Sequence, residues 1–570
     1  MRLQSRMNCV EQAGAIRKAR TRIRYHSNMP QPSTHLRRDV SRWGLVALGI
    51  SGVVGSGWLY APMEAVKQAG PAALVAWVVG AGLMLIMGYC LAELACSFPV
   101  SGSSAQVSSV THGRGMSLIN MWLLFFAYVT TPSIEATSIV TYSAMYFPEF
   151  TVGKEANLSH TGQVVTVLLI AFFTVLNFFG VRWLIRMNSV ITWWKIAIPA
   201  SVGLVLIFTK FDSANLTSHG AGFMPGGVQS IFAALSMGGI VFTLCGFRII
   251  GDLAGEAKNP AKDIPFAFLM STVFALALYF IVQLAFLGAL DASEYVHGWK
   301  NIAIPQANAP FLAILMVAGL PLMVKVLYFD AVISPGGSCL AYVGSTGRVV
   351  YAAAQQRFAW NILLQLNKQG VPVLALVFSW IVSSVVVFAY PKWTELANLN
   401  AAAYFLNVIS VPVSVVVLRR IEPRSRRPFQ MPGGIVMAFV AFASNLLIVY
   451  WSGVKSYIPV IVALCVIVFF AYAVPKLRGK PPVVNAWKPL VWLIPTAIVV
   501  IVVGWFGNED FGGTGDLTNS MDTAIIAVLS VPLFWMATRC GQPADQVRME
   551  LEHLRAEIGT DSDAGAAFRH

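Results

Sequence analysis

The chain has 570 residues, of which 56% are hydrophobic and only 12% are charged. A soluble domain carries roughly 25% charged residues, so this composition cannot cover a water-facing surface, and much of the molecule must face lipid. The formal net charge of +14 would suit nucleic acid, but its distribution along the chain fits the charge bias of membrane-protein loops instead. We therefore expect a polytopic α-helical membrane protein with no nucleic-acid partner.

The first segment, residues 1–42, is polar and basic, and we expect a cytoplasmic tail that touches anionic lipid. It lacks the apolar stretch of a cleavable signal peptide. A membrane-spanning helix needs about 20 mainly apolar residues, and fourteen such segments follow the tail. They lie near 43–66, 71–95, 117–147, 161–180, 189–209, 229–254, 265–290, 318–345, 371–390, 396–418, 434–453, 457–475, 487–505 and 521–539.

Two regions of this helix assignment stay open. The partly apolar stretch 291–317 suits a short external helix, and the sequence does not decide how 291–345 divides or whether 434–475 holds two helices. A tail from 541 to 570 ends the chain and contains the amphipathic stretch QVRMELEHLRAEI, which is typical of a surface helix.

The basic residues predict the orientation of these helices. With fourteen spans and a cytoplasmic N-terminus, the predicted inside segments hold 31 of the 40 Lys and Arg residues, and the outside loops hold 6. Such a bias indicates that the segments rich in Lys and Arg face the cytoplasm. We therefore expect both termini to lie in the cytoplasm.

Two of the predicted helices are interrupted by glycines. The first interrupted helix, at 43–66, reads GISGVVGSGWLY around Gly55, and the second, at 229–254, reads SMGGIVFTLCGFRIIGD around Gly246. Glycine-interrupted helices in corresponding positions of two halves point to a transporter site. Freed amides favour a carboxylate and freed carbonyls favour an ammonium, so a zwitterionic amino acid fits both ends. The alternative is close helix packing through small residues.

Five motifs in order resemble the amino acid–polyamine–organocation superfamily, and in particular its amino acid permeases similar to bacterial aspartate–proton symporters. The resemblance spans about 43–453, although Trp58-Leu59-Tyr60 replaces the more usual Ile-Phe after the first break. The motifs are GVVGSG at 52–57, AGPA at 69–72, AELACSFPVSG at 92–102, EAKNPAKDIP at 256–265 and RRIEPRSRRPFQMP at 419–432.

This resemblance implies a fold of five plus five helices in inverted repeats, with alternating access around a central site. Together with the predicted topology, it also implies a bacterial inner membrane. The first five-helix repeat would span 43–210 and the second 229–420, followed by four additional helices at 434–539. We expect Glu93, at the inner end of the helix at 71–95, to have a structural or gating role.

The resemblance also implies which residues hold the substrate. Amides near Ser56 and Gly57 would bind its carboxylate, and the carbonyl groups of Val53, Phe242 and Cys245 would bind its ammonium. Phe242 matches an aromatic gate position, with packing against lipid or core as the alternative. The full set of predicted substrate-binding residues is Val53, Gly55, Ser56, Gly57, Phe242, Cys245, Gly246 and Arg248.

Ionisable residues inside the predicted helices are candidates for ion coupling, because charge in the membrane is costly and usually functional. Lys195 follows a segment with Gly180, Val181, Arg182 and Asn188. By this position it resembles a lysine that, in some relatives, stands where sodium-coupled members bind sodium. We expect it to carry a proton; the alternative is a lysine that snorkels to the interface. Glu135 is the second candidate for proton coupling, and Asp330 is a further intramembrane acid. Arg248 suits either an acidic substrate side chain or neutralisation of Glu135 or Asp252.

Together these features predict a secondary active transporter for amino acids, coupled to protons by symport, with an acidic amino acid as a candidate cargo. The alternatives are an exchanger or a polyamine or cation transporter of the same fold, and a membrane receptor or sensor. The sequence contains no P-loop, metal-ligand cluster or nucleophile elbow. We therefore expect neither an enzyme nor a cofactor.

Overall fold

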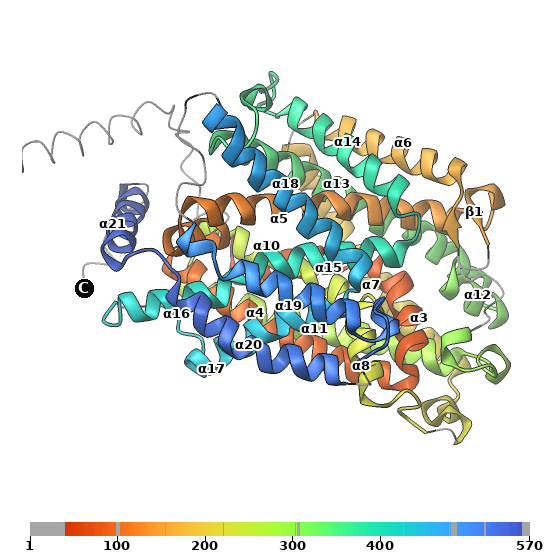
Figure 1. The fold of residues 1–570 in the computed structure, drawn as a ribbon. Coiled ribbons are helices and arrows are strands. Elements are labelled where there is room, and N and C mark those ends of the chain that lie inside the picture. The colour runs from red at the N-terminus through yellow and green to blue at the C-terminus, as the bar shows by residue number, and fades with distance from the viewer. Residues whose placement is uncertain are drawn as a thin grey trace, which may run out of the picture. The chain divides into compact units, whose positions relative to one another are not determined.

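The structure is a computed structural model, and almost all of its regular secondary structure is α-helical (Figure 1). It describes residues 40–98, 103–153, 156–179, 181–220, 222–302, 304, 308–425, 427–477, 479, 487–517 and 520–560. The predicted N-terminal tail therefore lies outside the described residues except for its last three.

The α-helices are, in chain order, α2 (Arg42–Val53), α3 (Gly57–Ala69), α4 (Ala73–Ser97), α5 (Ser103–Ser143), α6 (His160–Asn177), α7 (Val181–Lys210), α8 (Gly227–Ser236), α9 (Ile240–Leu244), α10 (Arg248–Asp252), α11 (Pro260–Ala289), α12 (Pro310–Val317), α13 (Pro321–Gln355), α14 (Val373–Ala389), α15 (Trp393–Val408), α16 (Ser410–Ile421), α17 (Gly434–Trp451), α18 (Val454–Leu477), α19 (Leu493–Phe506), α20 (Met521–Arg539) and α21 (Ala544–Thr560).

Short elements join these helices. Two strands, β1 (Thr151–Val152) and β2 (Asn157–Leu158), pair antiparallel between α5 and α6. The 3₁₀ helices are η1 (Gly70–Ala72), η2 (Pro148–Phe150), η3 (Ser213–Gly220), η4 (Cys245–Phe247), η5 (Ala254–Glu256), η6 (Ala292–Glu294), η7 (Trp299–Asn301), η8 (Asn361–Leu364), η9 (Lys488–Leu490) and η10 (Glu509–Phe511).

Local sequence explains where several helices begin. The side chain of Ser41 accepts a hydrogen bond from the backbone N–H of Gly44 at the start of α2, and Ser159 does the same for Gly162 at the start of α6. Serine is a favoured N-cap because its oxygen satisfies an amide that the helix leaves unpaired. Pro260 and Pro321 occupy the first positions of α11 and α13, where the missing N–H of proline costs nothing.

The described residues do not confirm the count of fourteen membrane spans. In the described residues, eleven helices are long and apolar enough to cross a membrane, or twelve if the bent pair Gly227–Ser236 and Ile240–Asp252 is one span. Every predicted range overlaps a helix. The run Gly57–Ser97, which covers parts of the first two predicted spans, forms one continuous helical stretch, and α14 is slightly too short to count as a span. The all-α polytopic class is confirmed, whereas the count of fourteen stays a prediction.

The open regions are also resolved. The stretch 291–317 contains the short α12 after two 3₁₀ turns, and 434–475 forms two helices, α17 and α18. The predicted amphipathic stretch of the C-terminal tail lies in α21.

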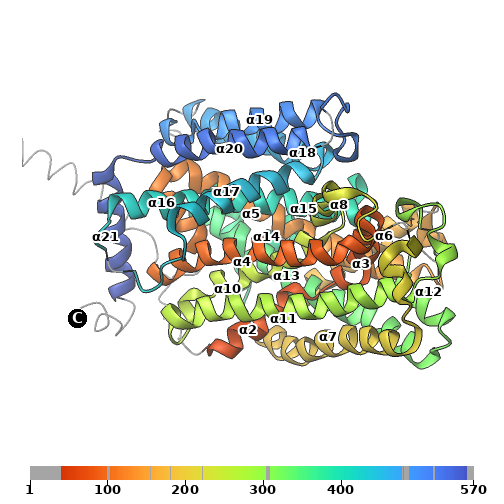
Figure 2. The same cartoon turned by 90° about the horizontal axis from the view of Figure 1, so that it is seen from below.

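Residues Arg38–Ile558 form one unit, in which the helices lie side by side. Within this unit, α18, α19 and α20 lie along one flank and α2, α7 and α11 along the opposite flank, with α4 and α5 between them (Figure 2). Burial follows this arrangement, because 89% of the apolar window in Ser108–Ser143 is buried but only 11% of that in Val454–Leu477. The α5 helix therefore forms the interior, and α18 presents its side chains to lipid.

Each interrupted helix is broken, and the larger bend of the second lies away from the predicted glycine. Helix α2 ends at Val53 and α3 begins at Gly57, so Gly55 lies in the break. The second interrupted helix bends by 47° between Ser236 and Ile240, where Gly239 has a φ of 74°. The α-helix is also interrupted at the predicted Gly246, because the 3₁₀ turn η4 separates α9 from α10. The sequence analysis did not predict the larger bend at Gly239, which adopts the left-handed conformation after α8.

A buried carboxylate joins the end of α4 to the loop between α16 and α17. Glu93 is 2% exposed, and its Oε1 and Oε2 accept hydrogen bonds from Nε and Nη2 of Arg419 at 2.8 and 2.5 Å. The backbone N–H of Met431 donates to the same Oε2 at 2.8 Å, and Nε of Arg427 lies 3.7 Å from Oε1 of Glu93. These contacts bring together two of the sequence motifs and agree with a structural role for Glu93.

The segment before α2 is fastened to the segment after α10. Val40 and Ala257 form a parallel β-bridge, in which Val40 N–H donates to the carbonyl of Glu256 at 3.1 Å and Lys258 N–H donates to the carbonyl of Val40 at 3.0 Å. The start of the first broken helix and the end of the second are thereby joined through their backbones.

Candidate functional site

The break between α2 and α3 is held by an acid from α5. The backbone N–H of Ser56 donates to Oε2 of Glu135 at 2.8 Å, and Glu135 is 3% exposed. A Cβ at Gly55 would collide with Oε1 of Glu135 and lie 3.0 Å from Oγ of Ser338, so a larger residue there would displace the carboxyl group from the break. The Ser56 amide, which we predicted to bind the substrate carboxylate, is therefore occupied by a protein carboxyl group in this conformation.

The carbonyl side of the break also has a protein partner. The hydroxyl group of Tyr279, on α11, donates to the carbonyl of Val53 at 3.0 Å. A carbonyl oxygen has two lone pairs, so the predicted contact with a substrate ammonium would use the second one.

The two broken helices cross with their backbones in contact. A Cβ on Gly52 would lie 2.7 Å from the carbonyl oxygen of Gly246, and a Cβ on Gly246 would collide with the backbone of Gly52 and Val53. The small-residue packing that we considered as an alternative therefore does occur here, between α2 and η4. It coexists with the break at Gly55.

A small cavity of about 30 Å³ lies at this crossing. One water needs roughly 10–15 Å³, so the cavity holds about two waters and must widen to admit an amino acid. Ser56 and Arg248 are not among its lining residues, and the sequence did not predict Thr131, Thr243, Tyr342 or Asn400. The lining residues are Gly52, Val53, Gly55, Gly57, Thr131, Glu135, Phe242, Thr243, Cys245, Gly246, Tyr342 and Asn400.

Aromatic side chains cover the cavity on the α3 side. The ring of Phe242 meets that of Trp393 edge to face at 5.7 Å, and Trp393 stacks on Tyr60 at 5.1 Å. The indole N–H of Trp393 also donates to Oγ of Ser56 at 3.0 Å. Phe242 thus belongs to a layer contributed by α3, α9 and α15, as an aromatic gate requires.

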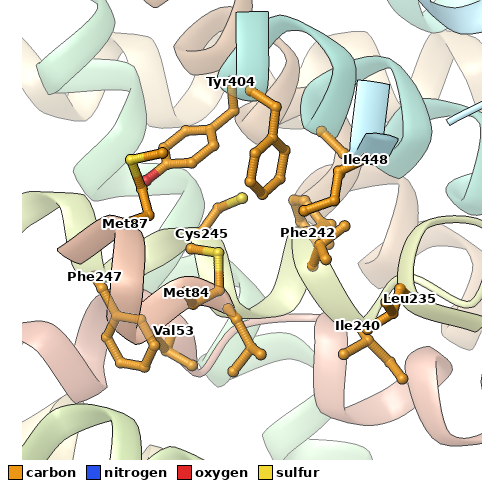
Figure 3. Close-up of a cluster of buried hydrophobic side chains, with 14 of the residues drawn as sticks. Val53, Met84, Met87, Leu235, Ile240, Phe242, Cys245, Phe247, Tyr404 and Ile448 are labelled. Carbon is orange, nitrogen blue, oxygen red and sulfur yellow. The ribbon is translucent and has the colours of Figure 1, made fainter. Parts of the chain in front are cut away.

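The second broken helix borders an apolar cluster. The side chains of Phe242 and Cys245 lie among those of Met84 and Met87 from α4 and Tyr404 from α15 (Figure 3). All of these side chains are buried. This packing fixes the position of α9 and η4, so the backbone beside the cavity is supported by a dense core.

Lys195 lies beside the first break, buried at 1% exposure on α7. Its Nζ donates to Oγ of Ser338, on α13, at 2.6 Å and to the carbonyl of Ser51, on α2, at 3.5 Å. A snorkelling lysine would extend toward the membrane surface, whereas this ammonium is bonded in the interior. Of the segment that suggested the match, Gly180 lies outside the described residues, as do the side chains of 181–190.

Arg248 pairs within the protein and does not reach the cavity. It is 2% exposed, donates from Nη1 to the amide oxygen of Asn407, and lies 3.5 Å from Oδ2 of Asp252 through Nε. Tyr128 completes the group, because its hydroxyl group donates to the same Asp252 oxygen at 2.7 Å. Of the roles considered for Arg248, the structure shows neutralisation of Asp252.

A larger cavity of about 500 Å³, the vestibule, adjoins the small one and shares Gly52 and Tyr342 with it. Its wall carries both basic and acidic groups, and it has room for an amino acid. Partial burial raises the pKa of the Glu256 carboxyl group above its ordinary value, against the opposing effect of the Arg348 guanidinium. The charged residues of the vestibule are Lys195, Asp252, Glu256 and Arg348.

A family model described as amino acid permease matches residues 40–503, which is most of the chain. The chain belongs to the amino acid permease family. This permease is 30% identical over 541 residues to the glutamate/serine transporter AimA of Bacillus subtilis (strain 168), with 93% of this chain and 99% of that protein covered. It is 29% identical over 513 residues to the aspartate-proton symporter of the same organism, with coverage of 89% and 98%.

A more distant relative shows how broad the family is. The D-serine/D-alanine/glycine transporter of Escherichia coli (strain K12) is 24% identical over 434 residues, covering 73% of this permease and 88% of that protein. These matches confirm the predicted resemblance and the assignment to transporters rather than enzymes. The permease is an integral membrane protein of the amino acid transport class.

Proposed function

We propose that this permease is a proton-coupled amino acid symporter that works by alternating access. The observation that carries the proposal is Lys195, a buried ammonium that bridges the carbonyl of Ser51 on α2 and the hydroxyl of Ser338 on α13. A lysine that loses its proton loses a donor to these groups, so proton occupancy would be linked to the contact between α2 and α13. The name of the aspartate-proton symporter relative supports the same coupling ion.

We propose acidic amino acids among the cargo. Support comes from two relatives, whose names give glutamate, serine and aspartate as their substrates. Arg248 does not support this choice, because its partners are Asp252 and Asn407. An acidic cargo would instead meet the amides and hydroxyls at the small cavity, including Thr131, Thr243 and Asn400.

The orientation of the permease follows from the charge bias, and we propose it on that basis. With both termini in the cytoplasm of a bacterial cell, the vestibule would open inward, and the aromatic layer around Trp393 would close the outer side. We also propose that 43–210 and 229–420 are two inverted five-helix repeats, followed by four helices at 434–539. The break near the start of each repeat and the direct contact between Gly52 and Gly246 support this arrangement.

The Lys195→Ala variant tests proton coupling. We expect proteoliposomes containing it to lose accumulation of labelled L-aspartate and L-glutamate driven by an inward proton gradient, because the titrating bridge between α2 and α13 is gone. Exchange of the same amino acids without a gradient should continue. Full concentrative uptake by this variant would reject the role of Lys195.

A substrate panel tests the cargo. L-aspartate, L-glutamate and L-serine should compete for uptake of labelled L-glutamate, and putrescine should not. Uptake of putrescine in place of amino acids would favour the polyamine transporter that the sequence left as an alternative.

A further inference from the structure

Asp330 is a fully buried acid that the coupling scheme above does not use. It lies on α13 at 0% exposure, and its Oδ2 accepts a hydrogen bond from the indole N–H of Trp58 at 3.1 Å. Trp58 is the second residue of α3 and is also fully buried. Asp330 thus joins α13 to the outer half of the broken helix α2–α3, while Lys195 joins α13 to its inner half.

The groups around Asp330 do not balance its charge. Lys195 from α7 acts on the carboxyl groups of both Asp330 and Glu135. Tyr142 from α5 and the indole of Trp194 from α7 also face Asp330. One ammonium cannot neutralise two buried carboxylates, and an uncompensated buried carboxylate is costly. An arrangement of low energy therefore has a proton on one of the two acids.

Asp330 and Lys195 differ in their access to the vestibule. Lys195 lines the vestibule, whereas Asp330 lines neither the vestibule nor the small cavity. Two further aromatic rings pack beside Trp58. The ring centroids of Trp58 and Phe311, on α12, lie 5.5 Å apart, and those of Phe311 and Phe286, on α11, lie 5.3 Å apart. Movement of α3 away from α12 and α13 would expose Asp330 to the side opposite the vestibule.

We propose that Asp330 is a second proton-coupling residue, which takes up a proton from the outer side before Trp58 closes over it. This inference rests on the proposed symport. In the outward-open state the carboxylate meets water and binds a proton. Closure then buries a neutral acid, whose carbonyl oxygen still accepts the Trp58 N–H. Closure over an ionised Asp330 would bury an unbalanced charge, so the outer side closes readily only after proton uptake.

The test compares Asp330→Asn, which keeps the acceptor but cannot ionise, with Asp522→Asn as the matched control. Asp522 is also fully buried, but it lies on α20 and accepts from Tyr450 and from Asn508 N–H. In proteoliposomes, Asp330→Asn should keep L-glutamate exchange and lose proton-driven accumulation, with an inside-to-outside ratio of about 1 because the coupling free energy is gone. Asp522→Asn should accumulate L-glutamate as the wild type does.

Two results overturn the proposal. One is accumulation by Asp330→Asn with the wild-type dependence on external pH. The other is loss of exchange in an Asp330→Asn protein that remains folded, since that indicates a purely structural residue. If Asp330→Asn does not fold, Trp58→Phe provides the test, because it keeps the ring and the carboxyl group but removes the donor. The Trp58→Phe variant should hold the outer side closed less firmly than the wild type. Kinetics of L-glutamate exchange identical to the wild type would overturn the proposal.

Hydrogen exchange separates this inference from the proposed function. In the wild type without amino acid, the amide hydrogen exchange of the peptide 57–69, measured relative to that of 521–539, should depend on pH, because protonation shifts the population of outer-closed states. In Asp330→Asn this relative exchange should not depend on pH. A wild type that transports no amino acid would overturn the symport proposal, whereas equal pH dependence in both proteins would overturn the role of Asp330.

Discussion

Two glycines at the helix crossing show how single residues determine this site. Gly52 and Gly246 have no side chain at the point where α2 meets η4, and each would place a Cβ against the backbone of the other. Adding atoms to a tightly packed interior forces backbone shifts. The crossing therefore requires glycine on both helices, independently of any substrate.

Gly246→Ala should destabilise the permease by roughly 1–3 kcal/mol and abolish exchange of labelled amino acids, because the crossing beside the small cavity must open. Thermal unfolding in detergent and exchange in proteoliposomes measure the two effects. Gly82→Ala is the matched control, because a Cβ there meets nothing within 4 Å on α4. It should be neutral or stabilising by up to about 1 kcal/mol, and an equal effect of both variants would contradict the packing argument.

Arg248 shows what could and could not be predicted for single residues. Its partner Asp252 is four positions away on the same segment, and the sequence analysis included that pair as one of the alternatives. Its other partner, Asn407, lies 159 residues away, and no spacing rule indicates such a contact. The residues around the break were predicted as a group from the glycine pattern and the family motifs. Trp393, Thr131 and Asn400 were not predicted, because they lie on other helices, α5 and α15.

At the scale of elements, local patterns predicted the helices and the first break, but not the 47° bend of the second broken helix. Helix 229–254 contains both the Gly238-Gly239 pair and Gly246, and either can interrupt a helix in the sequence. The choice between them depends on α2, which packs against Gly246 and holds it in a helical turn. Tertiary contact therefore decided which glycine bends the chain.

The junction between α4 and the α16–α17 loop gives a prediction at this scale. Glu93→Gln should lower the free energy of unfolding by about 2–3 kcal/mol, since bonds to charged groups are strong and Arg419 loses a bidentate partner. Chemical denaturation in detergent measures this change.

The matched control is Lys300→Gln, which breaks an exposed ion pair with Asp510 whose side chains are 64% and 47% exposed. Exposed pairs contribute less than about 1 kcal/mol. Equal destabilisation by the two variants would show that Glu93 does not act as a buried junction.

At the scale of the whole molecule, the described conformation is open on one side only. The vestibule reaches from Lys195 to Gln356 at the end of α13, while the aromatic layer covers the other side of the small cavity. In the predicted orientation the vestibule opens toward the cytoplasm.

Ala341→Cys tests both the open side and the orientation. Ala341 is exposed and lines the vestibule, so in a protein whose Cys9, Cys465 and Cys540 are replaced by serine, an impermeant maleimide should label Ala341→Cys in inside-out membrane vesicles. Right-side-out vesicles should label weakly. The reverse pattern would show that the vestibule faces outward.

The partners of the first broken helix are far from it in the sequence, and this separation has a consequence for how the protein is made. Trp58 and Asp330 are 272 residues apart, and Ser56 and Trp393 are 337 apart. At synthesis rates of about 5–20 residues per second, the ribosome needs roughly 15 to 50 seconds to reach Asp330 after Trp58. During that time the polar groups at the break have no final partners, so the newly inserted helix must be kept hydrated or sheltered by the insertion machinery until the later helices arrive.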